Sequence, residues 1–329
     1  MTNIFDNKVV LITGGTGSFG KKCVEIMLSR YNLKKLIVFS RDELKQYEMA
    51  QVFPLEKYPC MRYFLGDVRD IDRLYRVFDG VDYIIHAAAL KHVPIAERNP
   101  IEVVKTNVIG AENVINASID SGVEKVIALS TDKAVNPINL YGATKLCSDK
   151  LFIAANSYSG SKKTKFSIVR YGNVVGSRGS VVPLFRSMRE KGVITITDTR
   201  MTRFWISLEQ GVDFVLNSFN LMEGGEIFVP KIPSMKIIDL ANAVAPDCRH
   251  EIVGIRPGEK LHEVLLTEDD SRHALEYDDF YIIEPEFNWW TNERTRDNGV
   301  RPVKEGFIFK SDTNTLWLGA DELTSLVNE

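Results

Sequence analysis

The sequence is poor in the features that mark several protein classes. Four cysteines stand among 329 residues, far apart at Cys23, Cys60, Cys147 and Cys248. This spacing fits neither a disulfide framework nor a metal-ligand pattern, so we expect reduced thiols and no metal site. Because the first apolar run looks like a strand rather than a leader peptide, we also expect a cytoplasmic protein.

Long apolar runs and an excess of one charge are missing as well. No stretch has the length needed to span a bilayer, so a membrane is not an expected partner. The net charge of −3 gives no reason to expect binding to nucleic acid or to an anionic membrane. With 44% hydrophobic residues, the chain can bury a large core, and the composition predicts a soluble protein with one large and one smaller domain.

The amino-terminal residues predict the order strand, glycine turn, helix. The apolar run 8–13 is typical of a strand, and the amphipathic stretch 21–29 is typical of a helix. Gly14 and Gly17 lie between them, and they allow a tight turn that approaches a pyrophosphate at the helix N-terminus. Gly20 allows the helix to pack closely on the sheet. The pattern predicts a dinucleotide site.

The end of the second predicted strand, 35–39, indicates which dinucleotide is bound. An acidic residue about 20 positions after the glycines would bind a ribose 2′-hydroxyl. This sequence has Ser40 and Arg41 there instead, with Lys45 nearby, and these side chains suit a 2′-phosphate. We therefore predict NADP, although Asp42 keeps NAD open and Arg41 could be an ordinary solvated charge.

Strand and helix patterns continue to alternate along the chain. Four more buried strands are predicted at 61–65, 81–85, 125–129 and 166–169. Together they predict an α/β fold, a Rossmann-like doubly wound parallel sheet with a smaller carboxyl-terminal lobe. The predicted domains are 1–174 for the cofactor, with about 205–232 returning to it, and 175–329 for the substrate lobe and tail. The tail after about residue 285 gives no clear pattern.

Five residues in two short segments suggest chemistry. Tyr141 and Lys145 lie four residues apart, on one helix face, so the ammonium can lower the phenol pKa and prepare a base. Thr131, Asp132 and Lys133 follow a predicted strand. Ordinary solvated helix faces also carry such Tyr and Lys pairs, and Asp132 with Lys133 could be a plain salt bridge. Beside a dinucleotide site, however, the five residues predict acid–base chemistry coupled to hydride transfer.

Beyond residue 171, loops carry the polar groups. The glycine-rich segment 170–183 predicts a crossing from the cofactor half to a substrate lobe. Basic segments follow at 197–205 and 255–260. Arginines on Gly/Pro turns can bind a diphosphate, so these segments predict a nucleotide-linked substrate, with unliganded surface arginines as the alternative.

These motifs together resemble the extended short-chain dehydrogenase/reductase family over about residues 13–285, and within it the nucleotide-sugar 4,6-dehydratases. Retaining dehydratases typically carry Thr-Asp-Glu where this chain has Thr131-Asp132-Lys133. The lysine, with the segments 89–94, 139–142 and 256–260, is similar to the inverting UDP-N-acetylglucosamine 4,6-dehydratases of pseudaminic acid biosynthesis. A sister group of C5-epimerising dehydratases shares Asp-Lys but typically has methionine at the tyrosine position, so Tyr141 favours the pseudaminic branch.

The resemblance also implies site residues and an assembly. The NADP site would be lined by Gly14, Thr16, Gly17, Ser18, Phe19, Gly20, Ser40, Arg41, Asp42, Glu43, Leu44, Lys45, Asp67, Val68, Ala87, Thr106, Asn107, Tyr141, Lys145 and Val174. The UDP-sugar site would be lined by Lys91, Asn173, Arg178, Gly179, Ser180, Val181, Val182, Thr197, Met201, Arg203, Arg256 and Glu259. The family forms homo-oligomers, often hexamers, and its NADP is regenerated in each turnover.

The same resemblance implies a reaction sequence. Tyr141 takes the C4 hydroxyl proton while hydride leaves C4, and Thr131 hydrogen-bonds the same oxygen. Lys133 then takes the C5 proton, Asp132 protonates the C6 hydroxyl, and hydride returns to C6. Protonation of C5 from the opposite face gives the L-arabino product. An ion pair between Lys133 and Asp132 would oppose the neutral states that these roles need.

Two rival functions remain. A UDP-sugar 4-epimerase needs no group to remove a C5 proton, so Asp132 and Lys133 count against it. A non-catalytic NADP-binding protein would usually lose the tyrosine or lysine, whereas Tyr141 and Lys145 are both present.

Overall fold

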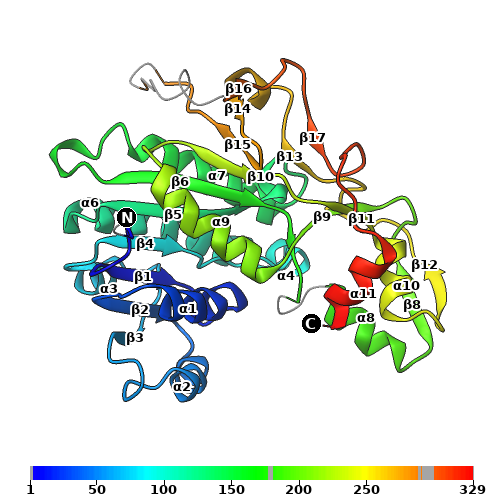
Figure 1. The fold of residues 1–329 in the computed structure, drawn as a ribbon, viewed down its shortest axis with the longest axis horizontal. Coiled ribbons are helices and arrows are strands. Elements are labelled where there is room, and N and C mark those ends of the chain that lie inside the picture. The colour runs from blue at the N-terminus through cyan, green and yellow to red at the C-terminus, as the bar shows by residue number, and fades with distance from the viewer. Residues whose placement is uncertain (1–2, 177–180, 288–289, 291–299, 329) are drawn as a thin grey trace.

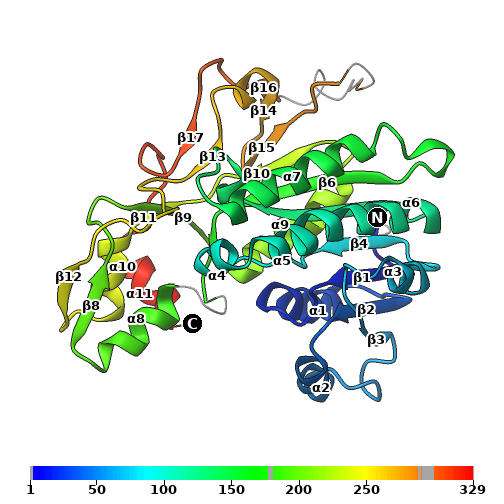
Figure 2. The same cartoon turned by 180° about the vertical axis from the view of Figure 1, so that it is seen from behind.

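The computed structural model of the protein describes residues 3–176, 181–287, 290 and 300–328. Within them, one large sheet carries helices on both faces, and a smaller lobe lies beside it (Figures 1 and 2). Its parallel strands follow the order β3, β2, β1, β4, β5, β6, β10. Their bounds are β1 Val9–Thr13, β2 Lys35–Ser40, β3 Met61–Leu65, β4 Tyr83–His86, β5 Lys125–Thr131, β6 Lys165–Tyr171 and β10 Ile227–Pro230. The predicted doubly wound parallel sheet is confirmed.

The six predicted strands are all present. Parallel strands are covered on both faces, so they read as continuous apolar runs, and every residue of β1 is buried. The main difference lies at the carboxyl ends of two strands. β5 and β6 extend to Thr131 and Tyr171, which are paired in the ladder. The sheet therefore carries Thr131 directly to the edge where ligands bind in such folds.

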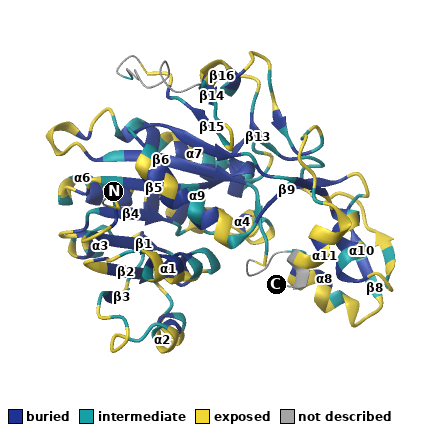
Figure 3. Cartoon of the chain, viewed as in Figure 1, coloured by how far each residue is buried: buried dark blue, intermediate teal, exposed yellow. Residues whose placement is uncertain are grey.

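The helices cover the sheet on both sides. The pair α1 and α9 packs together on one face (Figure 1), and α6 packs with α3 and α7 on the other (Figure 2). Bounds are α1 Ser18–Arg30, α2 Glu43–Val52, α3 Ile71–Phe78, α4 Val93–Arg98, α5 Pro100–Val104, η1 Lys105–Ile109, α6 Gly110–Ser121, η2 Asp132–Ala134, α7 Leu140–Ala155, η3 Gly160–Lys162 and α9 Leu208–Leu221. Figure 3 shows the core as a buried band along the sheet, with exposed residues on the outer helix faces.

The chain leaves the large sheet after β6 and returns to it twice. It first builds β7 Asn173–Val174, α8 Val181–Arg189, β8 Val193–Ile196 and β9 Thr202–Ile206. It then returns through α9 and β10. Three antiparallel strands extend the sheet beyond β10, and their bounds are β15 Phe280–Ile283, β14 Ala274–Glu276 and β16 Arg301–Pro302.

The smaller lobe, on the right in Figure 1, has an apolar core of its own. It is built around β8 and β12, with α8, α10 and α11. The remaining bounds are β11 Ser234–Lys236, α10 Ile237–Val244, β12 Arg249–Ile252, β13 Val264–Leu266, η4 Asp270–His273, β17 Phe309–Lys310 and α11 Ala320–Asn328. None of the helices in the described ranges is both long enough and apolar enough to cross a membrane.

Candidate active site

A pocket of about 700 Å³ lies along the carboxyl ends of the parallel strands. Its walls come from the glycine turn after β1, the ends of β2 to β5, the start of α7, and β7. The predicted cofactor residues that line it are Gly14, Thr16, Gly17, Ser18, Phe19, Gly20, Ser40, Arg41, Asp42, Lys45, Asp67, Val68, Ala87, Thr106, Tyr141, Lys145 and Val174. One pocket thus joins the dinucleotide motif to the predicted catalytic residues.

The glycine turn is shaped by positions where a side chain would not fit. Gly14 has φ +65°, and a Cβ there would lie 2.9 Å from the Cα of Ala88. A Cβ on Gly20 would lie 2.3 Å from the carbonyl oxygen of Gly15. The glycine turn therefore lies close to the segment after β4, the first turn of α1 lies close to the glycine turn, and the helix N-terminus faces the pocket. This is the cradle that a pyrophosphate needs.

Arg41 and Asp67 lie at the end of the pocket where β2 and β3 finish. Arg41 Nη1 is 3.5 Å from Asp67 Oδ2, and Arg69 Nη2 is 2.6 Å from the same oxygen. Burial alone would raise the pKa of Asp67, but hydrogen bonds from Arg69 and the charge of Arg41 lower it overall. The side chain of Arg41 is 47% exposed, so its guanidinium can meet a phosphate in the pocket.

Asp42, which left NAD as an alternative cofactor in the sequence analysis, has a structural role. It is the N-cap of α2, where its Oδ1 accepts a hydrogen bond of 3.0 Å from the backbone N–H of Lys45. Its other oxygen pairs with the Lys45 ammonium. Ser40 is buried and its hydroxyl accepts from Gln46 Nε2 at 3.0 Å. The carboxylate of Asp42 is therefore occupied by the helix that it caps.

Three predicted cofactor residues do not line the pocket. Glu43 and Leu44 belong to the first turn of α2, and Leu44 is 66% exposed. Asn107 is buried, and its amide exchanges hydrogen bonds with the backbone of Leu90, donating at 2.9 Å and accepting at 2.8 Å. It also donates to Thr144 Oγ1 at 3.1 Å. Asn107 therefore holds the loop after β4 in place and does not line the pocket.

The two predicted catalytic segments meet because α7 is pressed against η2. Asn139 caps α7 by accepting a hydrogen bond of 2.8 Å from the N–H of Gly142. A Cβ on Gly142 would lie 2.1 Å from the carbonyl oxygen of Lys133, so only glycine allows this approach. Tyr141 and Lys145 consequently lie on the wall next to the end of β5. Both side chains are buried.

Lys133 forms the ion pair with Asp132 that would oppose neutral states of both groups. Its Nζ lies 3.0 Å from Asp132 Oδ1, 3.4 Å from Asn173 Oδ1 and 3.5 Å from Glu263 Oε1. Burial alone would lower the pKa of Lys133, but Asp132 and Glu263 raise it well above its usual value. Thr131 Oγ1 donates to Asp132 Oδ1 at 2.9 Å. Lys133 is therefore held as an ammonium.

Within this ion pair, Asp132 is the more deeply buried partner and does not line the pocket. Its side chain is fully buried, and only Thr131 and Lys133 of the three-residue segment line the pocket. Among the described residues, Asp132 Oδ2 has no hydrogen-bond partner. A buried carboxylate oxygen without a partner is costly, so this atom has unused capacity to accept a hydrogen bond.

The structure does not show the low pKa that was expected for Tyr141 beside Lys145. Burial raises this pKa to about 12, and the groups that lower it are the charge of Lys133 and a hydrogen bond with Thr131. Burial also lowers the pKa of Lys145 itself. Loss of solvation therefore has a larger effect on this phenol than the nearby positive charges.

Comparisons with known proteins agree with this arrangement. Residues 10–285 match the model of a family described as polysaccharide biosynthesis protein. The chain belongs to this family. A protein of Campylobacter jejuni named UDP-N-acetylglucosamine 4,6-dehydratase (inverting) is 57% identical and covers 99% of this chain and 98% of its own. A protein of Rickettsia conorii named UDP-glucose 4-epimerase is 44% identical, over 85% of this chain and 84% of its own.

Two solved structures share the fold of this polysaccharide biosynthesis protein. The structure of Pen from Bacillus thuringiensis has a TM-score of 0.90 and 37% identity, covering 99% of this chain and 98% of its own. DesIV from Streptomyces venezuelae, a dTDP-glucose 4,6-dehydratase with NAD bound, has a TM-score of 0.67 and 23% identity, covering 77% and 86%. The latter likeness shows the fold alone.

The residues predicted to bind substrate divide into three groups. The pocket is lined by Lys91, Asn173 and Val181. The segment Arg178, Gly179 and Ser180 lies outside the described residues. The other predicted residues lie in the smaller lobe or the loop before β13 and do not line the pocket, namely Val182, Thr197, Met201, Arg203, Arg256 and Glu259.

The contacts of Arg203 and Arg256 explain why these two arginines do not line the pocket. Arg203 is buried, and its guanidinium donates to the carbonyl oxygens of Thr202 at 2.7 Å and Lys260 at 2.9 Å. It therefore serves the protein's own backbone. Arg256 is 55% exposed and lies 3.9 Å from Glu259. An exposed ion pair of this kind contributes little to stability and does not fix the orientation of the Arg256 side chain.

Sequence analysis missed several buried ionisable residues next to the catalytic segment. Asp149 accepts a hydrogen bond of 2.6 Å from Ser130 Oγ, and its charge acts on Lys145. Its position four residues after Lys145 placed it on the same helix face, so the spacing could have revealed it. Glu263 gave no local signal, because it reaches Lys133 only through the tertiary fold.

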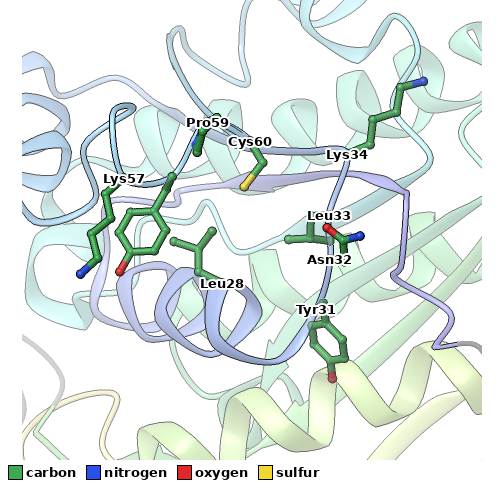
Figure 4. Close-up of a pocket in the computed structure, with 9 residues that line it drawn as sticks. Leu28, Tyr31, Asn32, Leu33, Lys34, Lys57, Pro59 and Cys60 are labelled. Carbon is green, nitrogen blue, oxygen red and sulfur yellow. The ribbon is translucent and has the colours of Figure 1, made fainter.

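A second hollow lies at the amino ends of β2 and β3, away from the glycine turn (Figure 4). The ammonium groups of Lys34 and Lys57 lie at opposite sides of the view and point away from its centre. Burial raises the pKa of the Cys60 thiol, so this cysteine is a poor nucleophile. The hollow offers no arrangement for acid–base chemistry.

Proposed function

We propose that this family member is an enzyme, an NADP-dependent UDP-N-acetylglucosamine 4,6-dehydratase that inverts C5. The observation that carries the proposal is the Asp132–Lys133 ion pair beside Tyr141, in a pocket that begins at a dinucleotide-binding turn. The 57% sequence identity, over nearly the full length, with the inverting dehydratase of Campylobacter jejuni supports it independently. The product would be UDP-2-acetamido-2,6-dideoxy-β-L-arabino-hex-4-ulose, at the first step of pseudaminic acid synthesis.

The pocket suits a nicotinamide dinucleotide. The glycine turn lines the pocket, and at Gly14 it lies too close to the backbone of Ala88 for any side chain, so backbone N–H groups rather than side chains would face a pyrophosphate there. Such a cofactor accepts a hydride from C4 of the sugar and returns it to C6, so no net oxidation occurs. Arg41, together with Ser40, would hold a 2′-phosphate, while Asp42 remains engaged as a helix cap. These contacts favour NADP over NAD.

The first proton transfer belongs to Tyr141. Its pKa of about 12 is too high for a base near neutral pH, and Lys133 already lowers it. The positive ring of an oxidised nicotinamide would lower it further, so that the phenolate can take the C4 hydroxyl proton. Thr131 lines the pocket and would donate a hydrogen bond to the same oxygen once its hydroxyl turns away from Asp132 Oδ1. Lys145 adds positive charge to this wall.

The elimination step requires the ion pair to become neutral. Lys133 passes a proton to Asp132 across their 3.0 Å hydrogen bond, which leaves an amine and a carboxylic acid. A dry, occupied pocket favours this change because it penalises charged forms. The amine then takes the C5 proton and the acid protonates the departing C6 hydroxyl. For this, substrate binding must turn the buried Asp132 side chain toward the pocket.

The 4-epimerase is the second candidate, because a UDP-glucose 4-epimerase is 44% identical to this chain. Mass spectrometry separates the two after incubation with UDP-N-acetylglucosamine and no added cofactor. The dehydratase releases one water, whereas an epimerase leaves the mass unchanged. An unchanged mass together with a new sugar stereoisomer would refute our proposal and establish the epimerase.

Substrate contacts and assembly belong to the same proposal. Lys91, Asn173 and Val181 would meet the UDP-sugar where they line the pocket. Val182, Thr197, Met201, Arg203, Arg256 and Glu259 would meet it only if the smaller lobe moved toward the sheet, and we propose such closure. We also propose that the protein forms a homo-oligomer, such as the hexamer that the family resemblance implies. Light scattering at several protein concentrations tests the assembly, and a monomer throughout would refute it.

A further inference from the structure

Glu263 is a buried carboxylate that the mechanism above does not use. It directly precedes β13, and its side chain is 2% exposed. Its Oε1 lies 3.5 Å from Lys133 Nζ and 3.8 Å from Arg203 Nε, and its Oε2 lies 3.6 Å from Lys260 Nζ. A buried charge is tolerated only when it is paired. One carboxylate thus holds three cations that come from η2, from β9 and from its own loop.

The backbone around Glu263 is fastened on two sides. Its N–H donates to Ser311 Oγ and its carbonyl oxygen accepts from the N–H of Ser311, both at 2.9 Å. Three residues earlier, Lys260 Nζ donates to the carbonyl oxygen of Val135 at 2.5 Å, just beyond η2. The carboxylate is therefore fixed relative to the catalytic turn. A charge in such a fixed position acts on the Lys133 ammonium at 3.5 Å without having to reorient.

We propose that Glu263 is a positioning residue that holds Lys133 at the pocket wall and sets its charge state; the catalytic part of this idea rests on the proposed function. An opposite charge at this distance favours the ammonium form of a lysine. The groups that face Lys133 from the surrounding elements are Asp132, Tyr141, Lys91, Arg203 and Glu263. Asp132 and Glu263 raise its pKa, and Arg203 lowers it.

This position gives Glu263 a defined part in the proton balance. Asp132 is consumed as the acid when it gives its proton to the leaving hydroxyl. At the same moment Lys133 gains the C5 proton and becomes an ammonium again. Glu263, at 3.5 Å from Lys133 Nζ, stabilises that new charge without taking part in the proton exchange between Lys133 and Asp132. The two carboxylates beside Lys133 thus have different roles: Asp132 exchanges a proton with the lysine, and Glu263 stabilises its positive charge.

The test is the pH dependence of Lys133 acylation in the full-length protein without substrate, followed by peptide mass spectrometry. In Glu263→Gln we expect the apparent pKa of Lys133 to fall by about 1 unit or more, because one of two opposite charges is removed. Glu263→Asp keeps the carboxylate but places it further from Lys133, so the pKa of Lys133 should fall by less. The matched control is Glu226→Gln, a buried carboxylate that accepts from Ser167 instead and should leave Lys133 unchanged.

An unchanged Lys133 pKa in Glu263→Gln would overturn the proposal and leave Glu263 with a purely structural role. If that variant does not fold, Glu263→Asp provides the decision by the same criterion. Because this titration needs no substrate, its result stands even if the protein forms no dehydrated sugar. In a working dehydratase, Glu263→Gln should also lower kcat at least tenfold with KM nearly unchanged, and Glu263→Asp should recover part of kcat.

Discussion

At the scale of single residues, the site is governed by the balance between burial and paired charge. Lys133 is 25% exposed and lies between two carboxylates, so its ammonium form is favoured although burial opposes it. At Tyr141 burial has the largest effect and raises the pKa to about 12; the charges of Asp132 and Asp149 also raise it, and the charge of Lys133 only partly opposes them. The two groups therefore start in protonated states, and both must lose a proton for the reaction to proceed.

Lys133→Met should remove the base for C5 while it keeps an unbranched side chain that is one atom shorter. We expect dehydration to slow by about 10²- to 10⁴-fold, the usual loss for a general base, and deuterium incorporation at C5 to disappear with it. Lys150→Met, an exposed lysine of α7, is the control and should keep wild-type activity. Normal C5 exchange in Lys133→Met would show that another group removes the proton.

His86 should make the protein sensitive to acid. It is buried, its Nδ1 lies 2.8 Å from Thr13 Oγ1, and burial, aided by the charge of Lys145, lowers its pKa from 6.5 to about 3. Between these two values the unfolded chain binds a proton that the folded chain does not. The free energy of unfolding should therefore fall as pH drops below about 6.5, by up to about 1.4 kcal/mol per pH unit.

Chemical denaturation between pH 7 and pH 4 measures this effect. His86→Asn should flatten the dependence relative to wild type, while His273→Asn, at an exposed position, should not. Equal slopes in wild type and His86→Asn would contradict the assignment of a neutral buried imidazole.

At the scale of elements, the contact of α7 with η2 assembles the catalytic groups. α7 carries Tyr141, Lys145 and Asp149 on successive turns of one face, and η2 carries Lys133. The two elements can approach because Gly142 has no side chain. A sequence can reveal the face of α7 by its four-residue spacing. It cannot reveal that Gly142 is the contact point, because the partner atom belongs to a backbone carbonyl nine positions away.

Gly142→Ala should push α7 away from η2, since its Cβ would lie 2.1 Å from the Lys133 carbonyl oxygen and 3.1 Å from Pro137 Cβ. We expect a loss of about 1–3 kcal/mol in the free energy of unfolding and a larger fractional loss of activity. Gly211→Ala on α9 is the matched control. The nearest atom to a Cβ there is 3.9 Å away, so the substitution should be neutral or stabilise by up to about 1 kcal/mol.

Denaturant unfolding and initial rates on the same preparations decide this prediction. If Gly142→Ala were as stable and as active as wild type, the close approach of α7 to η2 would not be what positions Tyr141.

At the scale of the whole molecule, the sequence predicted the parallel sheet and the dinucleotide end of the pocket well. Both depend on local signals: continuous apolar runs, a glycine turn at a strand end, and polar residues where strands finish. The smaller lobe was predicted poorly. Arg203 was expected at the substrate but donates to backbone carbonyls, and Glu263 was not expected at Lys133 at all. Such contacts depend on how loops far apart in sequence fold back, which no local spacing encodes.

The most direct test of the whole account is proton NMR of the purified protein with UDP-N-acetylglucosamine in D₂O, without added cofactor. We predict a new C6 methyl signal, deuterium at C5, and couplings of the L-arabino configuration, because C5 loses its proton to Lys133 and regains one from the solvent pool on the other face. Absence of a methyl signal, even after NADP⁺ is added, would contradict the dehydratase assignment. A methyl signal with retained configuration at C5 would contradict inversion.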